Sequence, residues 1–177
     1  MQVTPYNTNQ SKKTQVEDMF DNIAPKYDLL NHVLSMKIDV LWRNNLVKWM
    51  RKDHPKLVLD VATGTGDLAI AVQKGLEAEV VGLDLSQQML NVGIDKIKKI
   101  NLSDKITMVK GDAENLTFED NKFDAVSVAF GVRNFENLEK GLAELRRVVK
   151  ENGSVFILEF SKVEGFLGPF YMFYFKN

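Results

Sequence analysis

The chain has 177 residues, a formal net charge of −1, 45% hydrophobic residues and no cysteine. This length suggests one domain with enough residues for a hydrophobic core, and the balanced charge argues against a nucleic-acid binder held mainly by phosphate contacts. Without cysteine, the chain has no disulfide, thiolate metal site or thiol nucleophile.

The N-terminal residues, Met1 to Lys13, are polar and lack the apolar segment of a signal peptide. No run of the sequence approaches the ~20 apolar residues of a membrane span. We therefore expect a soluble cytoplasmic protein.

Two helices are predicted near the N-terminus, because apolar residues recur there at helical spacing. The first begins at Thr14, whose side chain is expected to cap it, with Glu17 completing a capping box. Ala24-Pro25 is expected to end this helix. The second is predicted from about Ile38 to Arg51, and His54-Pro55 breaks the chain after it.

Strands and helices then alternate. The predicted strands are Val58–Val61, Glu79–Leu83, Ile106–Val109, Phe123–Phe130 and Ser154–Phe160. The predicted helices are Leu68–Lys74, one capped by Ser86 that runs to Ile100, and Leu138–Lys150, with Asn152-Gly153 as its stop. This alternation predicts an α/β fold with a doubly wound, mostly parallel sheet. Its ligand site would lie beyond the carboxyl ends of the strands, near the switch point.

The stretch from Leu57 to Asp67 predicts a ligand site directly, because a strand runs into a glycine-rich turn and then a helix. Gly64-Thr65-Gly66-Asp67-Leu68-Ala69 fits the dinucleotide fingerprint, and Asp84 suits a ribose diol. One hypothesis is therefore an NAD-dependent oxidoreductase. This fingerprint alone has low specificity.

S-adenosylmethionine is the second hypothesis, and the carboxylates favour it. Asp60 can hold an ammonium group, whereas Asp60 and Asp67 would repel a pyrophosphate. Asp112 can accept from the exocyclic amine of adenine. Each carboxylate also has a purely structural interpretation: Asp60 would cap the turn, and Asp84 would cap the helix that begins at Ser86.

Several motifs resemble those of a known family. The turn from Asp60 to Asp67 resembles motif I of class I methyltransferases. The segment from Tyr27 to Ser35 and on to Trp42, the segment from Arg147 to Ser161, and Phe130-Gly131-Val132-Arg133-Asn134 are similar to the menaquinone/ubiquinone biosynthesis C-methyltransferases. The similarity spans Val16 to Ser161.

The resemblance implies a Rossmann-like fold with N-terminal helices and an S-adenosylmethionine-dependent conversion of demethylmenaquinol to menaquinol. The substrate would be a prenylated quinol, and neither nucleic acid nor a metal ion is expected. The turn and the resemblance together give these expected cofactor-binding residues: Asp60, Gly64, Thr65, Gly66, Asp84, Asp112 and Ala113. The chain departs from the family at Leu30, where methionine is usual, and at Asp39, where histidine is usual.

The expected catalytic residues are Arg133, Asn134 and Tyr27. Arg133 would stabilise the phenolate of the quinol, and Asn134 would orient its hydroxyl or a water. Tyr27 would serve lid closure or proton transfer. The structural alternative is that Arg133 pairs with an acid such as Glu159 and holds its loop.

We expect a single domain in three parts: an N-terminal helical cap over residues 1–55, a cofactor-binding core over 56–161, and the start of a truncated segment over 162–177. The last strands of the family would be missing, which would leave strand five as a sheet edge. Self-association, such as a homodimer, and a peripheral contact at the inner face of the membrane follow as expectations. Methylation of another quinol or phenol, or an inactive cofactor-binding fragment, remain alternatives.

Overall fold

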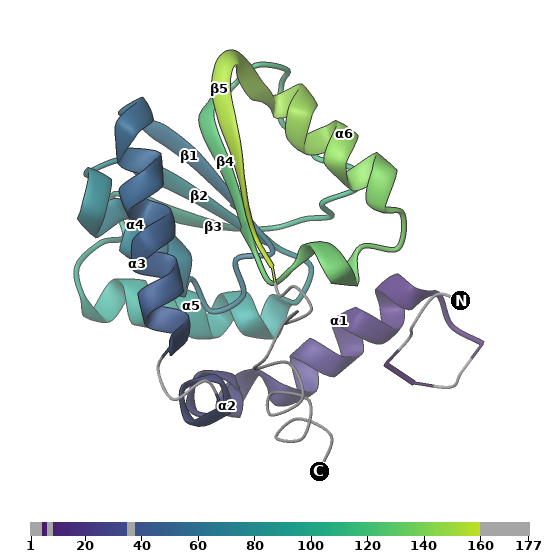
Figure 1. The fold of residues 1–177 in the computed structure, drawn as a ribbon. Helices are drawn as coiled ribbons and strands as arrows, with labels where there is room; N and C mark the ends of the chain where they lie inside the picture. Colours follow the sequence, from purple (N-terminus) through teal and green to yellow (C-terminus); the bar gives the residue numbers. More distant parts are fainter. Residues whose placement is uncertain (1–4, 7–8, 35–37, 160–177) are drawn as a thin grey trace, which may run out of the picture.

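The computed structural model describes residues 5–6, 9–34 and 38–159. In this part of the chain, five parallel strands form one sheet in the order β3-β2-β1-β4-β5 (Figure 1). The strands are β1 (Leu57–Val61), β2 (Glu79–Asp84), β3 (Ile106–Lys110), β4 (Phe123–Ala129) and β5 (Val149–Leu158). The chain runs outwards to β3 and then returns to β4, so the switch point lies between β1 and β4. The predicted doubly wound parallel sheet is confirmed.

Helices cover both faces of the sheet (Figure 1). On one face lie α3 (Ile38–Met50), α4 (Asp67–Leu76) and α5 (Gln87–Lys99), and on the other lies α6 (Leu138–Val148). Successive β1 residues serve opposite faces, because side chains alternate along a strand. Val58 packs in the core under α3 and α4, whereas Leu59 packs in the core under α6.

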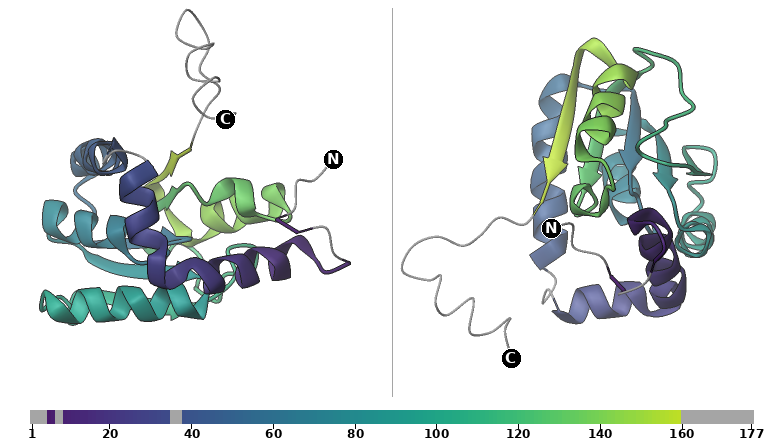
Figure 2. Two further views of the ribbon diagram at one scale, coloured as in Figure 1. Left: turned by 90° about the horizontal axis from the view of Figure 1, so that it is seen from below. Right: turned by 90° about the vertical axis from the view of Figure 1, so that its right-hand side faces the viewer.

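The N-terminal helices α1 (Lys12–Ile23) and α2 (Tyr27–Leu34) lie beyond the carboxyl ends of the strands, joined by the 3₁₀ turn η1 (Ala24–Lys26) (Figures 1 and 2). The prediction that Ala24-Pro25 ends the first helix is confirmed, because α1 stops at Ile23 and Ala24 is its C-cap. Pro25 lies in the 3₁₀ turn that follows, where proline is tolerated in the first turn. The predicted N-cap is wrong. Ser11, not Thr14, is the N-cap, since its Oγ accepts the Thr14 N–H at 3.2 Å.

The junction between α6 and β5 differs from the prediction. The helix ends at Val148 and β5 begins at once, so Asn152-Gly153 lies inside the strand rather than at a helix stop. The register with β4 shifts there from Phe123–Val149 to Ala125–Ser154, so the pairing of β5 with β4 is interrupted between these two pairs. Glycine is required at 153, because a Cβ would lie 2.5 Å from the Asp124 carbonyl oxygen.

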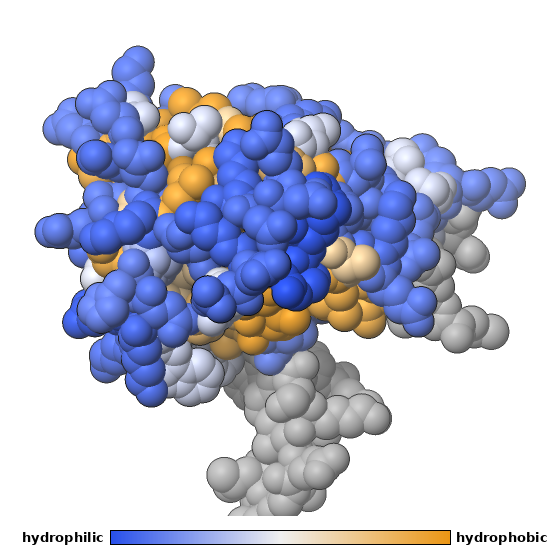
Figure 3. Space-filling model, turned by 90° about the horizontal axis from the view of Figure 1, so that it is seen from above, coloured by the Kyte–Doolittle hydropathy of each residue, from blue (hydrophilic) through white to orange (hydrophobic). Residues whose placement is uncertain are grey.

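Among the described strands, β3 and β5 form the edges of the sheet. Predictions for residues 162–177 lie outside the described residues. Seen from above in Figure 3, hydrophilic side chains cover most of the surface, and apolar side chains show between them. Exposed large apolar residues on α2 and α3 are Leu29, Leu30, Ile38, Leu41 and Trp49. None of the helices described is long and apolar enough to cross a membrane.

Candidate active site

A cavity of about 730 Å³, part of it open to solvent, lies at the carboxyl ends of the strands. Of the residues predicted from sequence, those that line it are Tyr27, Gly64, Asp84, Asp112, Ala113 and Asn134. The others, Asp60, Thr65, Gly66 and Arg133, are not among its lining residues. The roles of all these residues stay predictions.

Asp84 joins the glycine turn to the start of α5. Its Oδ2 accepts the Gly64 N–H at 2.7 Å, and its Oδ1 accepts the Ser86 N–H at 2.9 Å. Burial raises the pKa of Asp84, while these N–H donors oppose the rise. An ionised carboxylate has about four acceptor positions, more than its backbone donors occupy, so acceptor capacity remains for a diol in the cavity. The structural and ligand-binding interpretations of Asp84 are therefore compatible.

Asp60 lies beneath the turn, on the side of the sheet that α3 and α4 cover. It is 1% exposed, and its oxygens accept the hydroxyls of Thr63 at 2.6 Å and Ser127 at 2.8 Å. Asp60 and Ser127 are register partners on β1 and β4. Burial raises the pKa of Asp60 to about 6. This carboxylate therefore fixes the turn to β4 across the switch point.

Thr65 belongs to a charged network on the far side of the turn. Its Oγ1 donates to Asp28 of α2 at 2.6 Å and accepts from Lys96 of α5 at 3.1 Å. Lys96 also pairs with Asp28 at 2.9 Å and with Asp67 at the first residue of α4. The network ties α2, and with it Tyr27, to the turn. Sequence reasoning missed Lys96, because no local pattern marks contacts between such distant residues.

Asp39, where the family usually has histidine, extends this network. Its carboxylate lies 2.7 Å from Nη2 of Arg43, which is also 3.2 Å from Asp67. The i,i+4 spacing of Asp39 and Arg43 on α3 could have indicated this pair from the sequence. At 6% exposure, Asp39 serves to anchor α3 near the turn.

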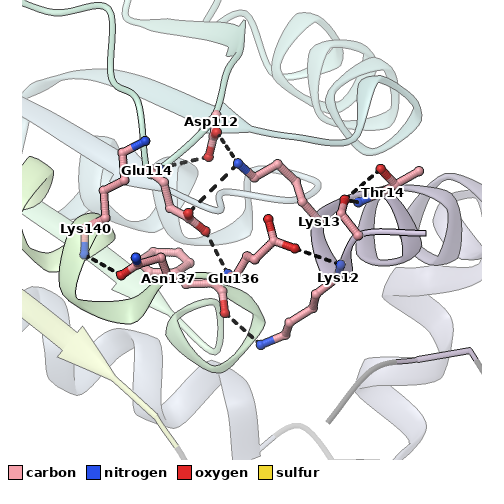
Figure 4. A network of polar contacts seen from close by, with 10 residues as sticks. Lys12, Lys13, Thr14, Asp112, Glu114, Glu136, Asn137 and Lys140 are labelled. Atoms are coloured by element: carbon pink, nitrogen blue, oxygen red, sulfur yellow. Dashed lines mark hydrogen bonds and ion pairs between the residues drawn. The ribbon is translucent and has the colours of Figure 1, made fainter. Parts of the chain in front are cut away.

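Asp112 is paired with a lysine of α1. The Lys13 Nζ lies 2.6 Å from Asp112 Oδ2, while Asp112 Oδ1 accepts the Glu114 N–H at 2.9 Å (Figure 4). The hydrogen bond to Asp112 raises the pKa of Lys13. Glu114, 5% exposed, accepts the Glu136 N–H at 2.7 Å. The side chain of Lys13 thus reaches the carboxylate predicted to bind adenine.

The other contacts of α1 are also polar. The Lys12 Nζ donates to the carbonyls of Arg133 at 2.8 Å and Phe135 at 2.7 Å, and the Lys12 N–H donates to Glu136 at 2.9 Å (Figure 4). Glu17 pairs with Lys110 at 2.8 Å. Only Gln15 and Val16 of α1 are buried. This helix therefore forms one wall of the cavity and is held largely by charge.

The predicted catalytic residues lie near the end of β4 and the start of α2. Tyr27 lines the cavity, and burial raises its pKa, whereas the Arg133 charge opposes the rise. Asn134 ends the 3₁₀ turn η3 (Val132–Asn134) and also lines the cavity. The Arg133 side chain is 51% exposed, and its Nη1 lies 3.0 Å from Glu159. The pairing with Glu159 is therefore present, and a catalytic role would require Arg133 to act from the cavity rim.

No group of three or more histidine, aspartate or glutamate side chains in the described ranges could hold a metal ion.

Comparisons with known proteins place this site in context. The model of the ubiE/COQ5 methyltransferase family matches residues 8–177. A demethylmenaquinone methyltransferase of Bacteroides fragilis is 49% identical over 165 residues, which are 93% of this chain and 67% of that protein. The ubiquinone/menaquinone biosynthesis C-methyltransferase UbiE of Geobacter sulfurreducens is 43% identical over 176 residues, 98% of this chain and 68% of that protein. The chain thus spans about two thirds of the length of these relatives.

A solved structure shares the fold. The crystal structure of a SAM-dependent methyltransferase from Aquifex aeolicus matches with a TM-score of 0.57 and 28% identity. The match covers 62% of this chain and 59% of that one.

Proposed function

The chain belongs to the ubiE/COQ5 methyltransferase family, and we propose from this premise that it transfers a methyl group from S-adenosylmethionine to a ring carbon of demethylmenaquinol, giving menaquinol. One observation carries the proposal. A single cavity is lined both by the acidic residues expected to bind the cofactor, Asp84 and Asp112, and by Tyr27 and Asn134. The methyl donor, S-adenosylmethionine, and the quinol that accepts the methyl group would therefore lie in the same cavity.

The residues of the cavity fit S-adenosylmethionine. Asp84 is held by two backbone N–H groups and keeps acceptor positions for the ribose hydroxyls. Asp112 and Ala113 would face adenine. The Gly64 backbone, at φ +57°, brings the turn to the cavity wall without a side chain. Bound S-adenosylmethionine would supply a methyl group on a cationic sulfonium, so no anion has to leave.

The residues around the acceptor would then raise its nucleophilicity and exclude water. A quinol ring carbon gains electron density when the neighbouring hydroxyl loses its proton. The positive charge of Arg133 would stabilise the resulting phenolate, and the Asn134 amide would orient the hydroxyl or a water. Tyr27, half-buried in the wall of the cavity, would close the cavity over the ring.

A prenylated quinol lies in the membrane because its chain is apolar, so the protein would have to contact the membrane surface to reach it. The exposed apolar residues Leu29, Leu30 and Leu41 lie on α2 and α3, and α2 begins at Tyr27 in the cavity wall. We expect the chain to float with vesicles of bacterial lipids, and Leu29→Ser/Leu30→Ser to reduce the bound fraction. Equal flotation of the chain and the double variant would contradict this contact.

Calorimetry separates this function from the NAD hypothesis. We expect S-adenosylmethionine to bind and NAD not to bind, because the carboxylates around the turn would repel a pyrophosphate. Binding of NAD without binding of S-adenosylmethionine would overturn the proposed function.

A further inference from the structure

Two residues at the switch point have a backbone conformation that their side chains disfavour. Ala62, just after β1, has φ +54°, and Phe130, just after β4, has φ +58°. Both line the cavity. Positive φ is an outlier for a bulky residue, and such strain persists where surrounding contacts enforce it, often at ligand sites. Phe130 has no part in the proposed cofactor site, so its conformation needs a separate explanation.

The backbone around Phe130 is fixed on several sides. The Phe130 N–H donates to the Leu158 carbonyl at 2.7 Å, which ties it to the end of β5. Gly131 packs directly on Ala62, since a Cβ at 131 would lie 2.5 Å from the Ala62 Cβ. The Gly131 carbonyl accepts the Asn134 N–H at 2.9 Å. These contacts hold Phe130 and Asn134 in one rigid turn.

The ring of Phe130 is also supported from α3. Its centroid lies 6.0 Å from that of Trp42, with the two planes tilted by 52°. This separation is in the favourable range for aromatic pairs. Phe130 therefore forms an aromatic wall of the cavity, with Trp42 packed against it and Asn134 at the same strand end. A flat apolar ring with polar edges is the ligand that such a wall fits.

We propose that Phe130, supported by Trp42, is the acceptor subsite and stacks against the fused two-ring system of a naphthoquinol. The identity of the ring rests on the proposed function. Phe130 would be a substrate-binding residue and Trp42 a positioning residue. A two-ring acceptor offers more stacking area than a one-ring benzoquinol, so the subsite would favour naphthoquinols.

Tryptophan fluorescence tests the subsite without turnover. The chain has two tryptophans, Trp42 and Trp49, so Trp49→Phe leaves Trp42 as the only reporter. The probe is a 1,4-naphthoquinol with a short prenyl chain, kept in its reduced form. It absorbs at the wavelengths at which tryptophan emits, so bound probe should quench the emission of Trp42. We expect saturable quenching, and an apparent affinity about 10-fold weaker in Phe130→Leu, which is a loss of about 1.4 kcal/mol. The matched benzoquinol should bind more weakly than the naphthoquinol.

Phe118→Leu is the matched control, because this ring packs on Phe123 and does not line the cavity. It should leave quenching unchanged. If Phe130→Leu does not fold, Phe130→Asn replaces it, because asparagine tolerates positive φ. Equal affinity in the Phe130 variants, or no saturable quenching in the parent, would overturn the subsite. Weakened binding in the Phe130 variants without methyl transfer by the parent would support the subsite and overturn the proposed reaction.

Discussion

The ammonium group of Lys13 lies 2.6 Å from Asp112 Oδ2, so a helix from the N-terminal segment is ion-paired with the carboxylate expected to receive adenine. A cofactor that binds Asp112 would share this carboxylate with Lys13 and the Glu114 N–H, or displace Lys13 from it. Entry of the cofactor is thereby coupled to the position of α1.

Lys13→Met should make cofactor exchange faster. The substitution removes one of the charge contacts that hold α1 over the cavity, so association and dissociation of S-adenosylmethionine should both accelerate, by about 10-fold for dissociation. Stopped-flow measurement of both rates checks this. Lys74→Met, on the exposed end of α4, is the control. If association and dissociation of S-adenosylmethionine are as slow in Lys13→Met as in Lys74→Met, the ion pair between Lys13 and Asp112 does not limit cofactor exchange.

Asp84→Asn should weaken cofactor binding without unfolding the chain. An amide can replace only one of the two acceptor oxygens that meet the Gly64 and Ser86 N–H groups. We expect a loss of about 2 kcal/mol, or roughly 30-fold in Kd, by calorimetry. Asp95→Asn, on the exposed side of α5, should bind as the parent does. Unchanged affinity in Asp84→Asn would exclude Asp84 from the ribose site.

Asp60 should make the folded state less stable as pH rises. Burial raises its folded-state pKa from 3.8 to about 6, so the folded state binds this proton more tightly than the unfolded state does. The stabilisation is present below about pH 4 and is lost as pH rises through about 6, by up to roughly 3 kcal/mol. Urea unfolding of the parent and Asp60→Asn between these values should show their difference changing with pH. A difference that stays constant would contradict the raised pKa.

Arg133→Lys should lower turnover while cofactor affinity stays unchanged. Lysine keeps the charge but loses the planar fork of donors, so stabilisation of a phenolate at a fixed geometry should weaken, with kcat down about 10-fold. Glu159→Gln distinguishes the structural alternative, because it removes the negative charge that pairs with Arg133 at 3.0 Å. If Arg133 only holds its loop, Glu159→Gln should lower kcat as much as Arg133→Lys does.

The fold was largely predictable because its elements carry local signals. The five strands were found from short apolar runs, and α3 to α6 from helical spacing. The errors lie where tertiary contacts decide. Val149 lies in β5 rather than in the helix, because it pairs with Phe123 of β4. The short helix α2 was not predicted, and its Asp28 accepts a hydrogen bond from Thr65 in the glycine turn.

The candidate site was predictable only where a motif marks a strand end. Asp84 and Asp112 directly follow or end apolar strands, so their place at the cavity could be read from the sequence. Lys13 and Lys96 lie in other segments and reach the site through pairing across the fold. The left-handed Phe130 gives no sequence signal, since phenylalanine disfavours that conformation.

Transfer of an isotopically labelled methyl group tests the central claim most directly. The chain would be incubated with S-adenosylmethionine labelled in its methyl group and with a short-chain demethylmenaquinol, and the product analysed by mass spectrometry and NMR. The account predicts menaquinol that carries the label on a ring carbon. Label on a hydroxyl oxygen, or no labelled quinol although S-adenosylmethionine binds, would contradict it.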